Sequence, residues 1–252
     1  MFFHKPSDAI KFTKDRLYHF GSEVKTERWQ SVSIDKSMWE LFGHNFGFEI
    51  PNSVSTLRNE VKPNLPWADD HFLERVGGRP LNPGNEYKNW PYYTYKKEND
   101  KFRTMDKKFS HTYMERIWPS NKHKGLRFEY GNLGDVVNLL REEPYTRQAF
   151  LPIWFPEDTG AVHRERVPCS IGYHFIRRAD YLHVFYYIRS CDYIRHFRDD
   201  IYLACRKLMW IIDELKSETD TWKNVVPGSY NMFITSLHVF KQEKELLKQR
   251  RI

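Results

Sequence analysis

Cysteine is scarce in this sequence, with three residues in 252, at positions 169, 191 and 205. Three thiols cannot all pair, and none of them lies at the CxxC spacing of a zinc site or a redox motif. The cysteine count therefore disfavours a disulfide-stapled scaffold and a zinc finger. It favours a reducing compartment, and we expect the protein in the cytoplasm.

Long apolar runs are also missing. No stretch approaches the roughly 18 consecutive apolar residues that a membrane-spanning helix needs. The first 15 residues contain Phe2 and Phe3 but no apolar segment of the kind found in secretory signals. We therefore expect neither a membrane segment nor a secretory leader.

What the sequence does contain is aromatic residues and positive charge. Hydrophobic residues make up 40% of the chain, aromatic residues 16% and charged residues 29%, which is enough apolar material to build a core. The length fits one large domain or two small ones. The net charge of +7 suggests an anionic partner, without distinguishing a nucleotide from a nucleic acid.

The least regular part of the chain is residues 63–121. It holds six prolines, three glycines and clustered lysines, together with tryptophans and tyrosines that need burial. These features predict loops around short elements, and they argue against a linker. We find no internal repeat.

The second half has clearer periodicity. Helical spacing of apolar residues predicts helices, and β-branched or aromatic stretches predict strands. The longest predicted helix begins near two aspartates, either of which can serve as its N-cap. The predicted helices are 135–143, 199–215 and a basic, mostly exposed one at 240–250, and the predicted strands are 149–155, 171–177, 181–189 and 228–239. Because helices and strands do not strictly alternate, the fold class is α+β.

Four short motifs carry the chemistry. Each one alone is weak evidence, because a lone cysteine before a strand is usually inert and a lone histidine is usually structural. In chain order they are Val167-Pro168-Cys169-Ser170, Arg189-Ser190-Cys191-Asp192, Phe197-Arg198-Asp199-Asp200 and Ser236-Leu237-His238-Val239-Phe240.

Together, in this order and spacing, the motifs resemble the thymidylate synthase family. The resemblance covers about residues 30–240 and includes upstream segments at 113–118 and 144–147. It implies an α+β fold with one large twisted mixed sheet whose back packs against a second copy in a homodimer. We expect a single domain over 1–252, with an N-terminal extension (1–30), a loop-rich insertion (63–121) and a basic C-terminal helix (240–252).

The resemblance also implies roles for individual residues. Cys169 is the nucleophile that adds to carbon 6 of a pyrimidine, so that carbon 5 can take a one-carbon unit from 5,10-methylenetetrahydrofolate. A nearby arginine lowers the pKa of such a thiol and binds phosphate through forked hydrogen bonds. The other implied roles are: phosphate binding for Arg189 and for Arg147 from the partner subunit, a place over the base for Tyr113, proton and water handling for Glu74, folate contacts for Asp192 and Trp90, and substrate contacts for Ser170, Ser190 and His238. Arg28 and Lys36 are both candidates for a further phosphate ligand.

Departures from the family pattern indicate the base. Thymidylate synthases carry asparagine where this chain has Asp200, and an amide suits uracil. A carboxyl accepts from the cytosine amino group, and a proton on N3 or on the carboxyl completes the pair. Asp200 thus resembles the phage deoxycytidylate hydroxymethylase branch of the family. The alternative for Asp200 is that it only caps a helix. The alternative for Glu74 is that it is a solvated residue on the surface of a helix.

Other departures lie nearby. Ser170 replaces a histidine, which is consistent with a changed base. Gln148 replaces an arginine, Phe240 replaces a tyrosine that holds the sugar, and His196 replaces a glycine. The choice between ribose and deoxyribose therefore stays open.

The sequence thus predicts a folate-dependent transferase that converts dCMP to 5-hydroxymethyl-dCMP without a metal, as suits a virus that modifies its DNA precursors in the host cytoplasm. Alternatives within the family are methyl transfer, or CMP or dUMP as the substrate. A catalytically dead scaffold is disfavoured by the joint presence of Cys169, Arg189 and Asp192. From another class, a basic nucleic-acid-binding protein would use the lysines and arginines after residue 240.

Overall fold

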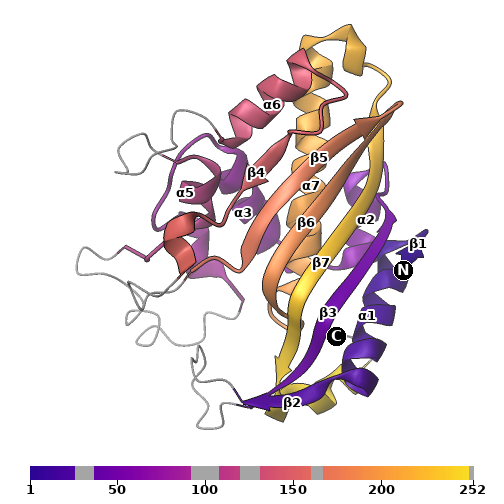
Figure 1. Cartoon of the computed structure of the whole chain (residues 1–252), viewed down its shortest axis with the longest axis vertical. Coiled ribbons are helices and arrows are strands. Elements are labelled where there is room, and N and C mark those ends of the chain that lie inside the picture. Colours follow the sequence, from indigo (N-terminus) through magenta and orange to yellow (C-terminus); the bar gives the residue numbers. More distant parts are fainter. Residues whose placement is uncertain (26–36, 92–107, 120–130, 160–166, 250–252) are drawn as a thin grey trace.

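The computed structural model describes residues 1–25, 37–91, 108–119, 131–159 and 167–249 (Figure 1). Arg28 and Lys36, the two candidates for a further phosphate ligand, lie outside the described residues. None of the helices in the described part is long and apolar enough to cross a membrane.

One large mixed sheet organises the described chain. Its order is β1-β3-β7-β6-β5-β4, with β2 pairing β3. The β6 and β7 strands run parallel, whereas the β5–β6 and β3–β7 pairs are antiparallel. The strands are β1 (Phe2–Phe3), β2 (Ser22–Lys25), β3 (Ser37–Glu49), β4 (Phe150–Pro152), β5 (Ser170–Arg178), β6 (Tyr181–Asp192) and β7 (Val226–Phe240). The predicted α+β class with a large mixed sheet is confirmed.

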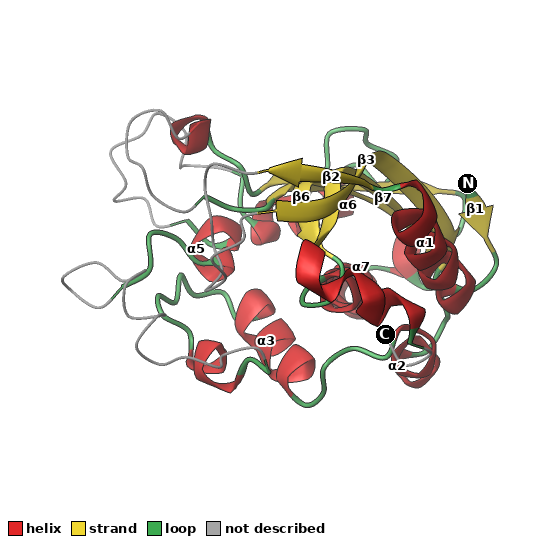
Figure 2. Cartoon of the chain, turned by 90° about the horizontal axis from the view of Figure 1, so that it is seen from below, coloured by secondary structure: helices red, strands yellow, loops and turns green. Residues whose placement is uncertain are grey.

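Helices cover one face of this sheet. Figure 2 shows α1, α2, α3 and α7 on the same side of the strands. The α-helices are α1 (Pro6–Phe20), α2 (Val54–Val61), α3 (Trp67–Val76), α5 (Tyr113–Ile117), α6 (Leu133–Glu142) and α7 (Phe197–Glu218). The 3₁₀ turns are η1 (Asn85–Asn89), η2 (Pro156–Thr159), η3 (Asp220–Trp222) and η4 (Lys241–Lys248). The segment expected as an N-terminal extension, residues 1–30, includes α1, whose Ala9, Ile10 and Leu17 are buried in the common core.

The central helix α7 forms where the apolar spacing predicted, but it starts earlier. Its N-cap is His196, which makes no capping bond through its side chain, so the predicted cap at Asp199 or Asp200 is wrong. Both carboxyls have other partners: Asp199 accepts two hydrogen bonds from Asn64, and Asp200 accepts one from Cys191. The two acids still lie in the first turn, where the helix dipole favours negative charge.

Two other predicted elements differ. The segment predicted as an α-helix after residue 240 is instead the 3₁₀ turn η4, and it packs on the body of the protein through buried Leu247 and an ion pair from Glu243 to Arg195. The strand predicted at 149–155 is shortened to β4, although the backbone N–H groups of Ile153 and Trp154 still donate to the Ile171 carbonyl of β5.

The other face of the sheet carries exposed aromatic side chains. Tyr187 and Phe233 stack with ring centroids 5.1 Å apart, and Phe150 contacts Tyr187 at 6.4 Å. Phe233 is 41% exposed and Phe150 is 38% exposed. In Figure 1 no described helix lies over these strands on the viewer's side, whereas α7 lies behind them.

Candidate active site

Cys169 lies immediately before β5, where the neighbouring strand holds its backbone. Its carbonyl oxygen accepts a hydrogen bond of 2.9 Å from the Arg189 backbone N–H. The residue is half-buried and its thiol is not in a disulfide. A partly accessible, reduced thiol at a strand end is available as a nucleophile.

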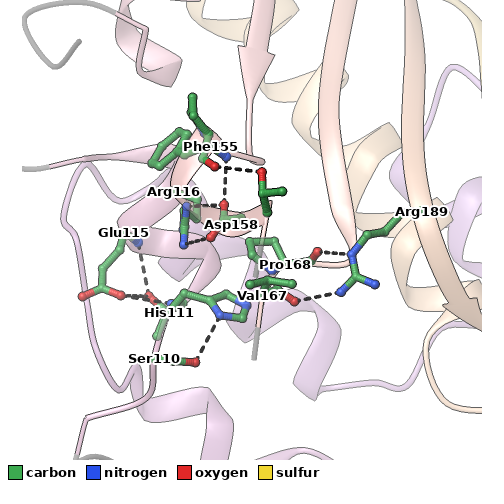
Figure 3. A network of polar contacts seen from close by, with 12 residues as sticks. Ser110, His111, Glu115, Arg116, Phe155, Asp158, Val167, Pro168 and Arg189 are labelled. Carbon is green, nitrogen blue, oxygen red and sulfur yellow. Dashed lines mark hydrogen bonds and ion pairs between the residues drawn. The ribbon is translucent and has the colours of Figure 1, made fainter. Parts of the chain in front are cut away.

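The Arg189 side chain fixes the segment that carries this thiol. Its Nε donates to the Pro168 carbonyl at 2.9 Å and its Nη2 to the Val167 carbonyl at 3.1 Å (Figure 3). The guanidinium also lies over the Trp154 ring, 5.3 Å from the centroid. Arg189 was predicted to bind phosphate, and the structure gives it a second task, since part of its donor fork already positions the backbone before Cys169.

A chain of hydroxyl groups runs from the cysteine segment into the interior. The buried Ser170 hydroxyl donates to the Tyr113 hydroxyl at 3.1 Å and shares a hydrogen bond of 2.5 Å with Tyr186. Tyr186 in turn hydrogen-bonds Asp200. The structure therefore brings Cys169, Ser170, Tyr113 and Asp200 together from β5, α5 and α7.

Asp200 is the most perturbed carboxyl in this group. Burial raises its pKa from 3.8 to about 7, and the neighbouring charge of Asp199 adds to the effect, while Arg75 and the hydrogen bonds from Cys191 and Tyr186 oppose it. The Cys191 thiol lies 3.8 Å from Oδ2, and burial raises the pKa of that thiol well above 9, so it stays a donor. Near neutral pH, Asp200 can therefore either donate or accept a hydrogen bond.

Sequence reasoning missed two residues of α3 that lie behind this site. Arg75 is 4% exposed, donates from Nε to His71 Nε2 at 3.0 Å, and lies 4.3 Å from the centroid of the Tyr113 ring. Burial lowers the pKa of His71 well below 6.5, so the imidazole is neutral and can accept this hydrogen bond. Their spacing of four residues on a helix was the available signal.

Glu74 is neither a solvated surface residue nor bonded to the cysteine group. Its Oε1 accepts from the backbone N–H of Asn85 at 2.6 Å and from that of Glu86 at 3.3 Å. Its Oε2 is buried and accepts from none of the described residues. That second oxygen is the one free to act on water.

Trp90 and His196 form a flat aromatic pair that the sequence did not indicate. Their rings stack with centroids 5.1 Å apart and an interplanar angle of 8°. His196 replaces the family's glycine at the start of α7, and the stack gives that substitution a structural role. The pair connects the loop-rich segment to the helix that carries Asp200.

Asp192 and His238 lie opposite each other on the parallel pair β6–β7, as Ser190 lies opposite Ser236. Asp192 accepts from the backbone N–H groups of Ile194 and Arg195, both at 3.0 Å, and pairs with the Arg195 guanidinium at 2.9 Å. Burial lowers the pKa of His238, so the ring is neutral at pH 7. Its buried Nδ1 has no hydrogen-bond partner among the described residues and is available to a ligand hydroxyl.

Arg147 does not join this cluster. The residue is exposed in the loop between α6 and β4, and its carbonyl oxygen accepts from His174 Nε2 on β5 at 3.0 Å. Within the described residues, no side-chain hydrogen bond or ion pair is found for its guanidinium. An exposed arginine of this kind is suited to a target outside its own subunit.

The cluster has the parts needed for nucleophilic catalysis on a flat polar ring. It combines a thiol on a fixed backbone, a carboxyl that titrates near neutrality and a hydroxyl network that runs from Ser170, the residue after the thiol, to that carboxyl. No group of three metal-binding side chains occurs within the residues that the structure describes.

Comparison with known proteins agrees with this chemistry. The family model described as thymidylate synthase matches residues 79–250. Among solved structures, the chain resembles thermostable thymidylate synthase A from Bacillus subtilis, with a TM-score of 0.70, 16% sequence identity, and coverage of 97% of this chain and 83% of that one. No curated protein matches the sequence.

Proposed function

Because the chain belongs to the thymidylate synthase family, we propose that it transfers a one-carbon unit to carbon 5 of a pyrimidine nucleotide, and that its substrate is dCMP and its product 5-hydroxymethyl-dCMP. The observation that carries the substrate assignment is Asp200, a carboxyl with a pKa of about 7 in the hydroxyl network beside Cys169. An asparagine there would suit uracil; a carboxyl that holds a proton offers a donor to cytosine N3 and an acceptor to the N4 amino group.

In the proposed mechanism the Cys169 thiolate adds to carbon 6 and forms a C–S bond. The electrons of the C5–C6 double bond then make carbon 5 nucleophilic, while Asp200 gives a proton to N3 and stabilises the developing charge. Once the one-carbon unit is bonded to carbon 5, that carbon loses its proton and the C–N bond to the folate breaks, so that tetrahydrofolate leaves and an exocyclic methylene group remains. Water then adds to this methylene group, and expulsion of Cys169 restores the ring. Overall, dCMP, methylenetetrahydrofolate and water give 5-hydroxymethyl-dCMP and tetrahydrofolate.

The folate co-substrate supplies the one-carbon unit when it is bound. The stacked pair of Trp90 and His196 presents flat aromatic surface suited to a pterin ring. Asp192 fits less well than the sequence suggested, because both of its oxygens already accept hydrogen bonds within the protein. Trp90 is thus the better supported of the two folate contacts.

Water delivery is assigned to Glu74. Its buried Oε2 has no donor among the described residues, whereas Oε1 is held by two backbone N–H groups. A carboxylate fixed through one oxygen can orient a water molecule with the other. Attack by that water gives a hydroxymethyl product, whereas hydride transfer would give a methyl group.

We also propose a homodimer in which Arg147 of one subunit binds the phosphate in the other. The exposed aromatic face of the sheet supports this, since apolar patches of that kind mark interaction surfaces. Arg147, which is exposed on the loop between α6 and β4, supports the shared site independently.

The test is to incubate the protein with methylenetetrahydrofolate and either dCMP or dUMP, and to weigh the products. Gain of CH₂O on dCMP supports the proposal. Gain of CH₂ on dCMP would mean that hydride transfer, and not water addition, completes the reaction. Product from dUMP alone contradicts the role of Asp200. Cys169→Ser should abolish product, with Cys205→Ala, a buried thiol elsewhere in α7, as the matched control. Salt-sensitive binding to polynucleotides with no product would favour the nucleic-acid-binding alternative.

A further inference from the structure

The buried group that the proposed mechanism leaves unused is Lys207 of α7. The residue is 1% exposed, and none of the described residues accepts a hydrogen bond from Nζ. The amine instead lies 3.4 Å from the centroid of the Tyr173 ring. An apolar side chain would fill this position at no electrostatic cost, whereas an ionised lysine without a partner costs several kcal/mol.

Lys207 is placed to act on Asp200. The two residues are seven positions apart on α7, which is about two helical turns, so they lie on the same face. Side chains on a helix lean toward its N-terminus, which directs the long lysine chain back along α7 toward the carboxyl. Tyr173, whose face the amine contacts, stacks on Tyr186 at 4.5 Å, and Tyr186 hydrogen-bonds Asp200.

We propose that Lys207 is a positioning residue for the base-reading carboxyl: the charge of its buried amine, two helical turns away on the same face of α7, sets the pH range in which Asp200 donates a hydrogen bond. This inference rests on the proposed role of Asp200. A buried ammonium at this distance favours the carboxylate, whereas a neutral side chain there lets Asp200 hold its proton to higher pH.

The phenols and the thiol around Asp200 keep a constant charge near neutrality. Burial raises the pKa of these tyrosines and of Cys191, so they stay protonated, and burial also raises the pKa of Asp199, the second carboxyl of the group. Burial lowers the pKa of Lys207 well below 10.5, the charge of Arg75 adds to this effect, and the carboxylate of Asp200 opposes it. The groups facing Asp200 are Arg75 (α3), Tyr113 (α5), Tyr173 (β5), Tyr186 and Cys191 (β6), Tyr230 (β7), and Asp199 and Lys207 (α7).

The first test is independent of activity. Lysine labelled with ¹³C at Cε is titrated by NMR in the wild-type protein and in Asp200→Asn, with the Lys207 signal identified by its loss in Lys207→Met, or in Lys207→Gln if the methionine variant does not fold. Removal of the carboxyl should lower the pKa of Lys207 by about one unit or more. An identical Lys207 titration in the two proteins would overturn the proposal.

The second test uses dCMP affinity as a function of pH. In Lys207→Met the carboxyl loses its ammonium partner and holds its proton longer, so the pH at which dCMP binding weakens should move upward by about one unit. The control is Lys216→Met, an exposed lysine of the same helix. An unmoved profile in a folded Lys207→Met variant counts against the inference. If wild-type protein binds no pyrimidine nucleotide at any pH, the proposed function fails, and the NMR titration still decides the coupling.

Discussion

At the scale of single residues, two adjacent aspartates have opposite tasks. Asp199 is 2% exposed and bonded twice to Asn64, whereas Asp200 belongs to the hydroxyl network beside Cys169. We expect Asp200→Asn to lower the ratio of kcat/KM for dCMP to that for dUMP roughly tenfold to a hundredfold, since each mismatched buried hydrogen bond costs about 1–3 kcal/mol.

The ratio is the quantity to measure, because the ionisation of Cys169 enters both rates and cancels. Asp199→Asn serves as the control, since it makes the same chemical change one position away and should leave the ratio alone. A similar fall in both variants would mean that α7 had been disturbed as a whole and that base reading does not belong to Asp200.

The raised pKa of Asp200 also predicts how the free energy of unfolding varies with pH. Its pKa is raised from 3.8 in the unfolded chain to about 7 in the folded protein, so between these values the folded state binds more protons. Its contribution to stability is therefore lost as pH rises from about 4 to 7, at up to about 1.4 kcal/mol per pH unit. Asp200→Asn should gain stability relative to wild type across this window.

Urea denaturation at about pH 5 and at about pH 8 checks this. The advantage of Asp200→Asn should be larger at the higher pH, and a difference that is the same at both would contradict the raised pKa. Asp213→Asn, an exposed carboxylate of the same helix, provides the matched control. Such a gain would show that the carboxyl is kept for function at a cost in stability.

At the scale of elements, the Asp199–Asn64 bonds attach the start of α7 to the segment between α2 and α3. The carboxylate accepts from the Asn64 backbone N–H at 2.8 Å and from Nδ2 at 2.7 Å. Asp199→Ala leaves both donors without their partner, and we expect a loss of about 2–4 kcal/mol in the free energy of unfolding. Chemical denaturation measures this, and an unchanged stability would mean that water replaces the carboxylate without cost.

Elements of strong periodicity could be predicted from the sequence, and contacts between distant elements could not. The apolar face of α7, the strand β7 and the β5–β6 hairpin follow from side-chain spacing. The partner of Asp199 in α7 is Asn64 and the partner of Glu243 in η4 is Arg195, and no local pattern reveals either contact.

The candidate site divides in the same way. Cys169 and Asp200 stand in motifs whose order indicates chemistry, and the structure places Asp200 in a hydroxyl network that includes Ser170, the residue after Cys169. Arg75, Lys207 and the Trp90–His196 stack were missed, because a single polar residue in a buried helix carries no sign of what faces it. Their partners come from other elements, so only the fold exposes them.

At the scale of the whole molecule, the aromatic face of the sheet predicts the oligomeric state. Tyr187 and Phe233 stack on a surface that no described helix covers in Figure 1. We expect Phe233→Glu to dissociate a dimer, because it buries a charge in an apolar interface. Sedimentation velocity measures the change, with Thr235→Glu, two residues along the same strand, testing how far the interface extends. A wild-type protein that sediments as a monomer would refute the dimer.

Shared sites make a stricter prediction, because they require residues of two copies to act together. If Arg147 serves the partner's site, neither Arg147→Ala nor Cys169→Ser is active alone, yet a mixed dimer contains one site with both native residues. Unfolding and refolding an equimolar mixture should then restore about one quarter of wild-type activity, since half of the randomly formed dimers are mixed and each has one intact site.

The control is a mixture of Glu74→Gln with Cys169→Ser. Because α3 and Cys169 belong to one subunit, that mixture also leaves one subunit of each mixed dimer without its cysteine and the other without its glutamate, and it should stay inactive. Recovery in the control but not in the Arg147 mixture would place Glu74, and not Arg147, across the interface.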